Sequence, residues 1–78
     1  MKDRLDELLS MAESALPGHL GIRFTDVTAG HVVAEMAVTP SVLAPNGFLH
    51  AGAVVALADS ACGVGCVANL PDDATGFT

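Results

Sequence analysis

The sequence predicts a small domain of the α+β class, and three stretches of the chain support that prediction. Residues 45–70 form a long apolar segment, residues 21–38 alternate between apolar and polar positions around a turn, and residues 1–16 carry leucines at helical spacing. A chain of 78 residues has room for one small domain. We therefore expect an N-terminal helix, a β-hairpin and a long central helix, in that order.

Met1–Leu16 is predicted to be an amphipathic helix that Leu16-Pro17-Gly18 ends. Its polar face is acidic, whereas helices that lie on membranes are usually basic. We therefore favour a helix packed on its own domain over one that binds a membrane surface or a partner. The apolar stripe consists of Leu5, Leu8, Leu9, Ala12 and Leu16.

Gly21–Thr28 and His31–Val38 are predicted to pair as an antiparallel hairpin around a tight turn at Ala29-Gly30. Each strand should present alternate side chains to the two faces of the hairpin. We interpret His31 at the start of the second strand, and His19 before the first, as structural or solvated residues. In the first strand one face holds Ile22, Phe24 and Asp26, and the other holds Arg23, Thr25 and Val27. In the second strand Val32, Ala34, Met36 and Val38 share a face, and Glu35 points to the other.

Thr39–Leu49 is predicted to be a loop with two prolines that leads directly into the central helix. The loop is long for a connection in so short a chain, and loops of this kind carry function more often than chance.

The segment Pro45–Leu70 is predicted to become a long helix after a polar turn, and Pro71 should stop it. A helix that is apolar all round is normally buried on every side or inserted in a membrane. We favour the buried helix, because a span over residues 51–70 would place Asp59 near the bilayer midplane, at a cost of at least about 2.5–3.5 kcal/mol. The glycines at 52, 63 and 65 predict either a close backbone neighbour or fraying after Ala61.

The charge and cysteine content of the chain limit the functions that it can have. The net charge is −6, with only three strong cations, and this argues against nucleic-acid binding, which needs a basic surface.

Cys62 and Cys66 are interpreted as small buried hydrophobic residues in a reducing cytosol, because helical spacing separates them too far for a relaxed disulfide. Little chain is left to surround the central helix, so we expect residues 1–78 to form one incomplete domain or a module completed by other chains.

The start of the central helix has the chemistry of an oxyanion site. The backbone N–H groups of Ala51, Gly52 and Ala53, with His50 beside them, would lie at a helix N-terminus, where free donors and the helix dipole stabilise negative charge. Asp59 lies roughly 13 Å further along the helix, so Asp59 would have to come from a second chain to reach the same carbonyl group. A carboxylate in an apolar setting becomes a usable base or nucleophile. On the residues alone, a catalytic and a structural role for Asp59 both stay open.

The run from Asn46 to Gly52, followed by Ala56–Asp59, resembles the hotdog-fold acyl-CoA thioesterases, in particular their phenylacetate-pathway (PaaI-like) branch. The shared features are an Asn-Gly turn, a His-Gly-Gly pattern that reads His-Ala-Gly here, and Leu-Ala-Asp at the matching distance. The resemblance implies an antiparallel sheet wrapped around the central helix, of which this chain holds the N-terminal part. Gly76-Phe77-Thr78 would begin the next strand.

The resemblance also implies roles for individual residues. Asp59 would activate water or attack the thioester, and the backbone N–H of Ala51 would polarise the thioester carbonyl group. His50 and Asn46 would shape the site, and Gly47 and Gly52 would border the substrate. The family usually has glycine where this chain has Ala51, so a methyl group crowds the approach to the carbonyl group.

The function implied by the resemblance is hydrolysis of an acyl- or aryl-CoA thioester in the cytoplasm by a homodimer or homotetramer with shared active sites. No cofactor, metal, nucleic acid or membrane is expected to take part. The alternatives are a non-catalytic truncated subunit that pairs with a full-length partner, and a small membrane peptide built on residues 51–70. A metal site from His50, Asp59, Cys62 and Cys66 matches no standard ligand spacing.

Overall fold

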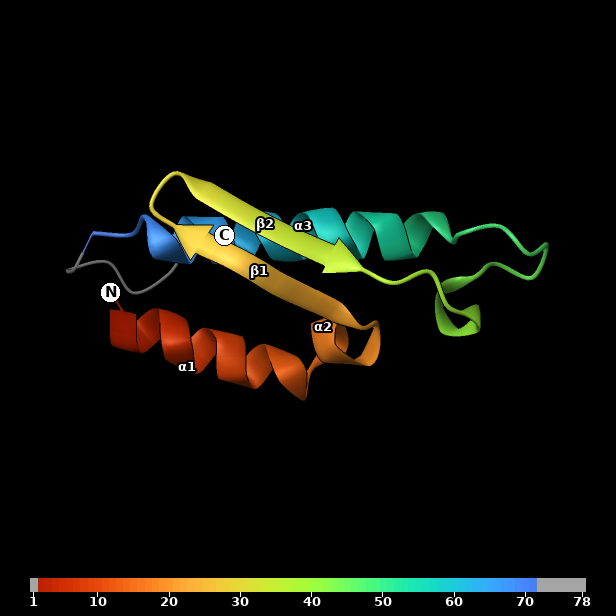
Figure 1. The fold of residues 1–78 in the computed structure, drawn as a ribbon, viewed down its shortest axis with the longest axis horizontal. Helices are drawn as coiled ribbons and strands as arrows, with labels where there is room; N and C mark the ends of the chain where they lie inside the picture. The colour runs from red at the N-terminus through yellow and green to blue at the C-terminus, as the bar shows by residue number, and fades with distance from the viewer. Residues whose placement is uncertain (1, 72–78) are drawn as a thin grey trace.

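A computed structural model of the chain describes residues 2–71 and confirms the predicted order of helix, hairpin and long helix (Figure 1). The antiparallel hairpin lies across the long helix, and the first helix runs beside the hairpin. This α+β arrangement is consistent with part of a hotdog fold. The strand predicted to begin at Gly76 lies outside the described residues. The elements are α1 (Lys2–Glu13), α2 (Leu16–His19), β1 (Ile22–Thr28), β2 (His31–Met36), the 3-10 helix η1 (Pro40–Val42) and α3 (Ala51–Ala68).

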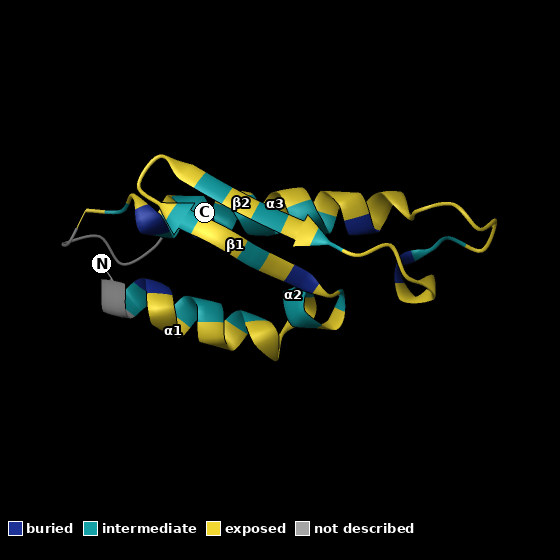
Figure 2. Cartoon of the chain, in the orientation of Figure 1, coloured by how far each residue is buried: buried dark blue, intermediate teal, exposed yellow. Residues whose placement is uncertain are grey.

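The core is small and joins α1, the hairpin and the C-terminal half of α3. Leu5, Val64 and Ala68 are its buried members. Figure 2 shows buried positions scattered through the fold, with most of the surface exposed or half-buried. The partly buried side chains packed against the core are Leu8, Leu9, Phe24, Val27, Val32 and Val67.

The first helix ends earlier than predicted. It stops at Glu13, and residues 16–19 form the separate short helix α2, with Pro17 in its first turn, where a missing N–H costs little. Leu16 therefore leaves the apolar stripe and is 61% exposed. The chain turns back so tightly that a Cβ atom on Gly18 would lie 1.8 Å from the carbonyl oxygen of Glu13. The predicted break at residues 16–18 is wrong by a few residues, because Pro17 and Gly18 build α2.

A β-bulge corrects the predicted faces of the first strand. Phe24 pairs with Ala34, but Asp26 pairs with Val33, so Thr25 is an extra residue in β1. The bulge shifts the alternation by one position. Val27 therefore packs against the core with Phe24, and Asp26 is exposed, the reverse of the prediction. The second strand follows its predicted alternation through Met36, whereas Val38 lies beyond the strand and is 65% exposed.

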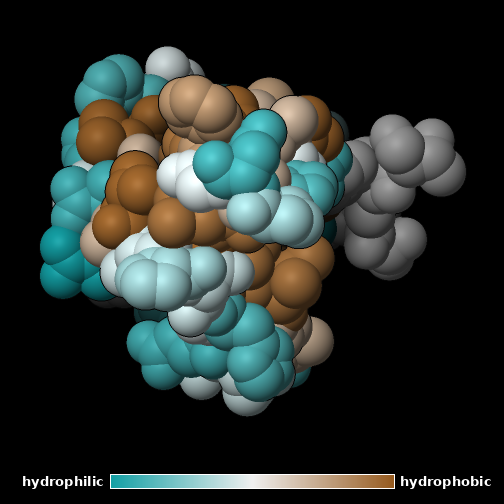
Figure 3. All heavy atoms as spheres, turned by 90° about the vertical axis from the view of Figure 1, so that its right-hand side faces the viewer, coloured by the Kyte–Doolittle hydropathy of each residue, from teal (hydrophilic) through white to brown (hydrophobic). Residues whose placement is uncertain are grey.

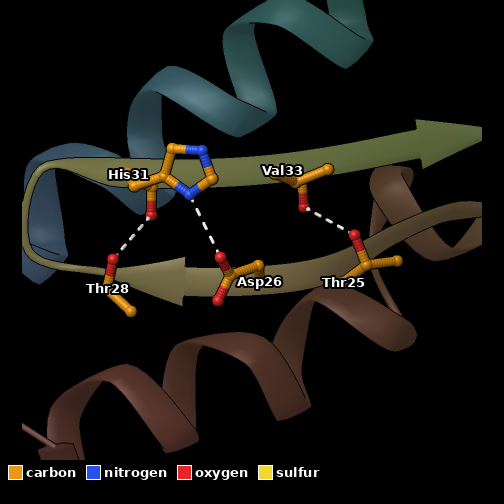
Figure 4. Close-up of polar contacts among 5 residues, drawn as sticks. All are labelled: Thr25, Asp26, Thr28, His31 and Val33. Atoms are coloured by element: carbon orange, nitrogen blue, oxygen red, sulfur yellow. Dashed lines mark hydrogen bonds and ion pairs between the residues drawn. The ribbon is translucent and has the colours of Figure 1, made fainter.

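Polar side chains fasten the hairpin from its exposed face. Nδ1 of His31 lies 3.0 Å from Oδ2 of Asp26, and the hydroxyl groups of Thr25 and Thr28 donate to the carbonyl oxygens of Val33 and His31 (Figure 4). Arg23 forms an ion pair with Glu35, which confirms that Glu35 faces away from the core. All of these pairs are exposed, so each stabilises the hairpin only weakly.

The long helix α3 runs without fraying from Ala51 to Ala68. Gly65 lies against the hairpin, where a Cβ atom would be 3.4 Å from Cγ2 of Val32. The hairpin and α1 cover only one side of α3, as expected for a chain that has few residues left to surround this helix. Its buried residues are Ala53, Val64 and Ala68, whereas Val54 and Val55 are 46% and 65% exposed.

Two further findings concern α3. Among the described residues it is the one helix long and apolar enough to cross a membrane, a test of length and composition that core helices of soluble proteins also pass. Cys62 and Cys66 are free thiols, and both are exposed rather than buried. They share the uncovered side of α3, because residues four apart lie on one face of a helix.

Candidate functional site at the start of α3

The loop before α3 is held in a defined shape by its own backbone. Leu43 and Leu49 form an isolated antiparallel bridge, and the N–H of Ala44 donates to the carbonyl oxygen of Phe48 at 2.7 Å. The N–H of His50 donates to the carbonyl oxygen of Val42 at 2.9 Å. These bonds fold residues 42–50 into a narrow excursion that returns the chain to the start of α3.

The tip of this excursion uses the Asn-Gly pair that the sequence singled out. The side-chain oxygen of Asn46 accepts a hydrogen bond from the N–H of Phe48 at 3.2 Å, which closes an Asx turn. Gly47 has a φ of 88°, in the left-handed region that favours glycine. Phe48 is 73% exposed at the tip. Asn46 and Gly47 therefore form the turn that the sequence predicted before the long helix.

His50 is the N-cap of α3. Its Nδ1 accepts a hydrogen bond from the N–H of Gly52 at 2.8 Å, so the ring caps the helix in its neutral form with Nδ1 unprotonated. A Cβ atom at position 52 would lie 2.9 Å from Nδ1, closer than real Cβ atoms come, so the glycine at this position leaves room for the imidazole ring. The cap therefore joins His50 and Gly52, two residues that the sequence predicted for the candidate site.

One backbone donor at this helix start stays open. The N–H groups of Ala53 and Val54 donate to the carbonyl oxygen of His50, and that of Gly52 donates to the His50 ring. Within residues 2–71, the N–H of Ala51 has no protein partner. The expectation of three open donors at Ala51, Gly52 and Ala53 is therefore corrected to one. That donor belongs to Ala51, the residue expected to polarise a carbonyl group.

The structure does not bring Asp59 to this donor within one chain. Asp59 lies more than two turns further along α3, a rise of about 12 Å from Ala51. Its side chain is exposed, so the apolar surroundings expected for this carboxylate are absent on one side. A site that uses both groups needs two chains.

Two hollows lie along the side of α3 that faces α1 and α2. One, of about 280 Å³, lies at the helix start between α2, η1 and α3 and includes His50 and Gly52. The other, of about 250 Å³, lies between α1, β1 and α3, and Asp59 is in its lining. Leu8, Ala12 and Phe24 were not among the residues that the sequence predicted for a site. Their apolar periodicity marks them as inward-facing, but only the packed structure shows that they leave a space beside Asp59.

The loop end of the molecule is partly apolar. Figure 3 looks onto this end and shows hydrophobic atoms between polar patches. Phe48, Val54 and Val55 are among the large hydrophobic residues exposed in this chain. The site region thus combines an open backbone donor with apolar surface.

Comparison with curated proteins shows the class of protein to which the chain is related. The chain is a distant homologue of thioesterases over about 70% of its length. The proofreading thioesterase EntH of Klebsiella pneumoniae is 41% identical over 56 residues, which are 72% of this chain and 41% of that protein. The 1,4-dihydroxy-2-naphthoyl-CoA hydrolase of Listeria monocytogenes is 35% identical over 54 residues, 69% of this chain and 44% of that protein.

The chain thus spans about four tenths of the length of these curated relatives. No protein-family model matches it, and no solved structure matches it at a significant level. The homology supports thioester chemistry, and the residues that perform it in this chain are a matter for proposal.

Proposed function

We propose that this chain is part of an enzyme that hydrolyses acyl- or aryl-CoA thioesters. The observation that carries the proposal is the open N–H of Ala51 at the N-terminus of the 18-residue helix α3, in a chain homologous to thioesterases. A donor at this position points at the ligand and adds to the positive end of the helix dipole. It stabilises the negative charge that a thioester carbonyl oxygen gains when the carbonyl carbon is attacked.

Asp59 is proposed as the catalytic carboxylate. It acts either as a base that takes a proton from the attacking water, or as a nucleophile that forms an anhydride which water then cleaves. In both routes the thiolate of coenzyme A leaves and the acyl group ends as a carboxylate. Asn46 and His50 act as positioning residues, because they hold the loop and the helix start rather than the reacting atoms. Gly47 and Gly52 border the substrate and leave its approach open.

The active site is proposed to be shared between chains of a homodimer or homotetramer. The rise of about 12 Å between Ala51 and Asp59 prevents one chain from supplying both groups to one carbonyl. The uncovered side of α3, with Val54 and Val55 exposed, is an apolar surface of the kind that association buries. A partner's α3 packed antiparallel there would bring its Asp59 towards Ala51.

The reaction needs no cofactor or metal, and we place the enzyme in the cytoplasm without nucleic-acid or membrane partners. Its acidic composition supports the exclusion of nucleic acid. The competing candidate is a membrane peptide, which the length and apolar surface of α3 favour. Fractionation separates the two: the enzyme stays in the soluble fraction, whereas a spanning helix stays in membranes washed with alkaline carbonate.

Two variants test the catalytic assignment. Asp59→Asn keeps the shape of the side chain and removes its charge, so thiol release from acyl-CoA should be lost while the circular dichroism spectrum is kept. Ala51→Pro removes the N–H at the first helical position, which proline tolerates, and His50 already has the extended ψ of 131° that a following proline needs. Its turnover should fall by about 10²–10³-fold. Ala51→Gly is the matched control, because it keeps the donor and should retain turnover.

Mixing the two inactive variants tests the shared site. In a dimer that contains one Asp59→Asn chain and one Ala51→Pro chain, one of the two sites keeps both functional groups. A mixture at equal concentrations should regain about a quarter of wild-type turnover, because half of the dimers are mixed. Regained turnover would also exclude the alternative in which this chain is a non-catalytic subunit that pairs with a full-length partner. Unchanged turnover in Asp59→Asn would refute the assignment of Asp59.

A further inference from the structure

We infer that the hollow beside Asp59 seats the acyl group of the substrate, and that the N-terminal helix α1 thereby limits the size of that group. The inference rests on the proposed thioesterase function and adds to it the class of acyl group that the enzyme accepts.

The lining of this hollow is almost entirely apolar. Leu8 and Ala12 come from α1, Phe24 from β1, and Val64 from α3, so the wall is made of aliphatic and aromatic carbon. Asp59 and Ser60 are the polar side chains in its described lining, and no cation is among the lining residues. Such a surface favours an uncharged hydrocarbon group and disfavours an acyl group with a second carboxylate, because that charge would be desolvated without a partner.

The position of the hollow fits the order of atoms in a thioester. The carboxylate that attacks or activates water must lie beside the carbonyl carbon, and the first carbon of the acyl group is bonded to that same atom. An apolar space with Asp59 in its lining is therefore where the acyl group continues. The hollow at the helix start does not have Asp59 in its lining, so it does not adjoin the carbon atom that this carboxylate attacks or hydrates.

The volume sets the size class. A cavity of about 150 Å³ lined by aliphatic and aromatic residues holds one benzene molecule. At about 250 Å³ the hollow beside Asp59 is larger. In proportion, it holds a single aromatic ring with a short linker, or a straight chain of about six to ten carbons. Ala12 on α1 is the smallest side chain that this helix places in the wall, so a larger side chain at this position would take up part of the space.

The experiment changes the wall from α1 in both directions. Ala12→Phe fills the hollow, and Leu8→Ala enlarges it. Met11→Phe is the matched control, because it introduces the same ring at a neighbouring position that is 60% exposed and outside the lining. The measurement is kcat/KM for acetyl-, hexanoyl-, decanoyl- and benzoyl-CoA. Circular dichroism first shows that each variant is folded.

The expected result is a change in preference. Ala12→Phe should lower kcat/KM for hexanoyl- and benzoyl-CoA by at least about tenfold relative to acetyl-CoA, since even one methylene group changes discrimination by about 10–200-fold. Leu8→Ala should shift the preference towards decanoyl-CoA, and Met11→Phe should keep the wild-type profile. If Ala12→Phe does not fold, the shift in Leu8→Ala decides the question. Wild-type profiles in both wall variants would overturn the inference while leaving thioesterase activity established.

A binding measurement separates this inference from the proposed function. S-hexyl-CoA is a thioether that cannot be hydrolysed, and its affinity relative to coenzyme A is measured by calorimetry. If the wild-type protein hydrolyses no thioester, the proposed function fails. A gain in affinity from the hexyl group that Ala12→Phe removes and Met11→Phe keeps would still show that the hollow holds the chain. Equal affinity for S-hexyl-CoA and coenzyme A would overturn the inference.

Discussion

Leu5→Ala should destabilise the fold, because Leu5 joins the first turns of α1 to the C-terminal half of α3. Leu5 is 8% exposed and packs with Val64 and Ala68. The substitution removes roughly three methylene equivalents, worth about 2.4 kcal/mol at about 0.8 kcal/mol each, and nearly all of this is lost because the side chain is nearly buried. The space left behind adds to the cost where α1 cannot close it. We expect a loss of about 2–3 kcal/mol in the free energy of unfolding.

The assay is urea unfolding followed by far-UV circular dichroism, with the midpoint and the slope compared between variants. For a domain of this size the same loss lowers the melting temperature by about 10–20 °C. Met11→Ala, on the exposed side of the same helix, is the control and should change stability by less than about 0.5 kcal/mol. A loss below about 0.5 kcal/mol in Leu5→Ala would show that α1 does not depend on this contact and would refute the described core.

Two further predictions concern glycines and the helix cap. Gly18→Ala should destabilise the protein by more than about 2 kcal/mol in the same unfolding assay, because its Cβ atom would overlap the carbonyl oxygen of Glu13. Gly65→Ala should be neutral or stabilise by up to about 1 kcal/mol, because its Cβ atom would make only an ordinary contact and alanine favours the helix; equal losses in the two variants would contradict this packing. His50→Ala should cost about 0.5–2 kcal/mol, and His50→Asn should restore most of it, since asparagine also caps helices. A His50→Asn variant as unstable as His50→Ala would show that the ring contributes something other than the cap.

The elements that the sequence predicted correctly are those with strong periodicity. Alternation around Ala29-Gly30 gave the hairpin to within a residue at its first strand, and the apolar run after His50 gave α3 with its start at Ala51. The stripe through Leu5 and Leu8 gave α1. In each case the pattern reports which side of an element must leave water, and that requirement holds before any tertiary contact forms.

The predictions that failed depend on neighbours. The bulge at Thr25 moves Val27 into the core and Asp26 out of it, and this exchange depends on which residues of β2 pair with β1. The end of α1 at Glu13 depends on how closely Gly18 approaches it. The burial of Cys62 and Cys66 was inferred from hydrophobicity alone, and both thiols are exposed because the hairpin covers the other side of α3.

For the candidate site, the sequence placed the right residues in the right segment but did not give their bonds. The Asn46-Gly47 turn and the helix start at His50 follow from residue types with well-known turn and boundary preferences. The His50 ring accepts the hydrogen bond from the N–H of Gly52, so the N–H of Ala51 is the donor that stays open. This outcome depends on one side-chain conformation of His50.

By itself, the sequence determined the order of the elements, the length of the apolar helix, the acidic charge and the position of Asp59 within that helix. Local propensity and periodicity are properties of the chain and need no partner. The tertiary structure decided which donor at the helix start stays open, which side of α3 is covered, and that α1 leaves an apolar space beside Asp59. These are matters of packing, in which side chains far apart in sequence compete for the same volume and the same hydrogen-bonding partners.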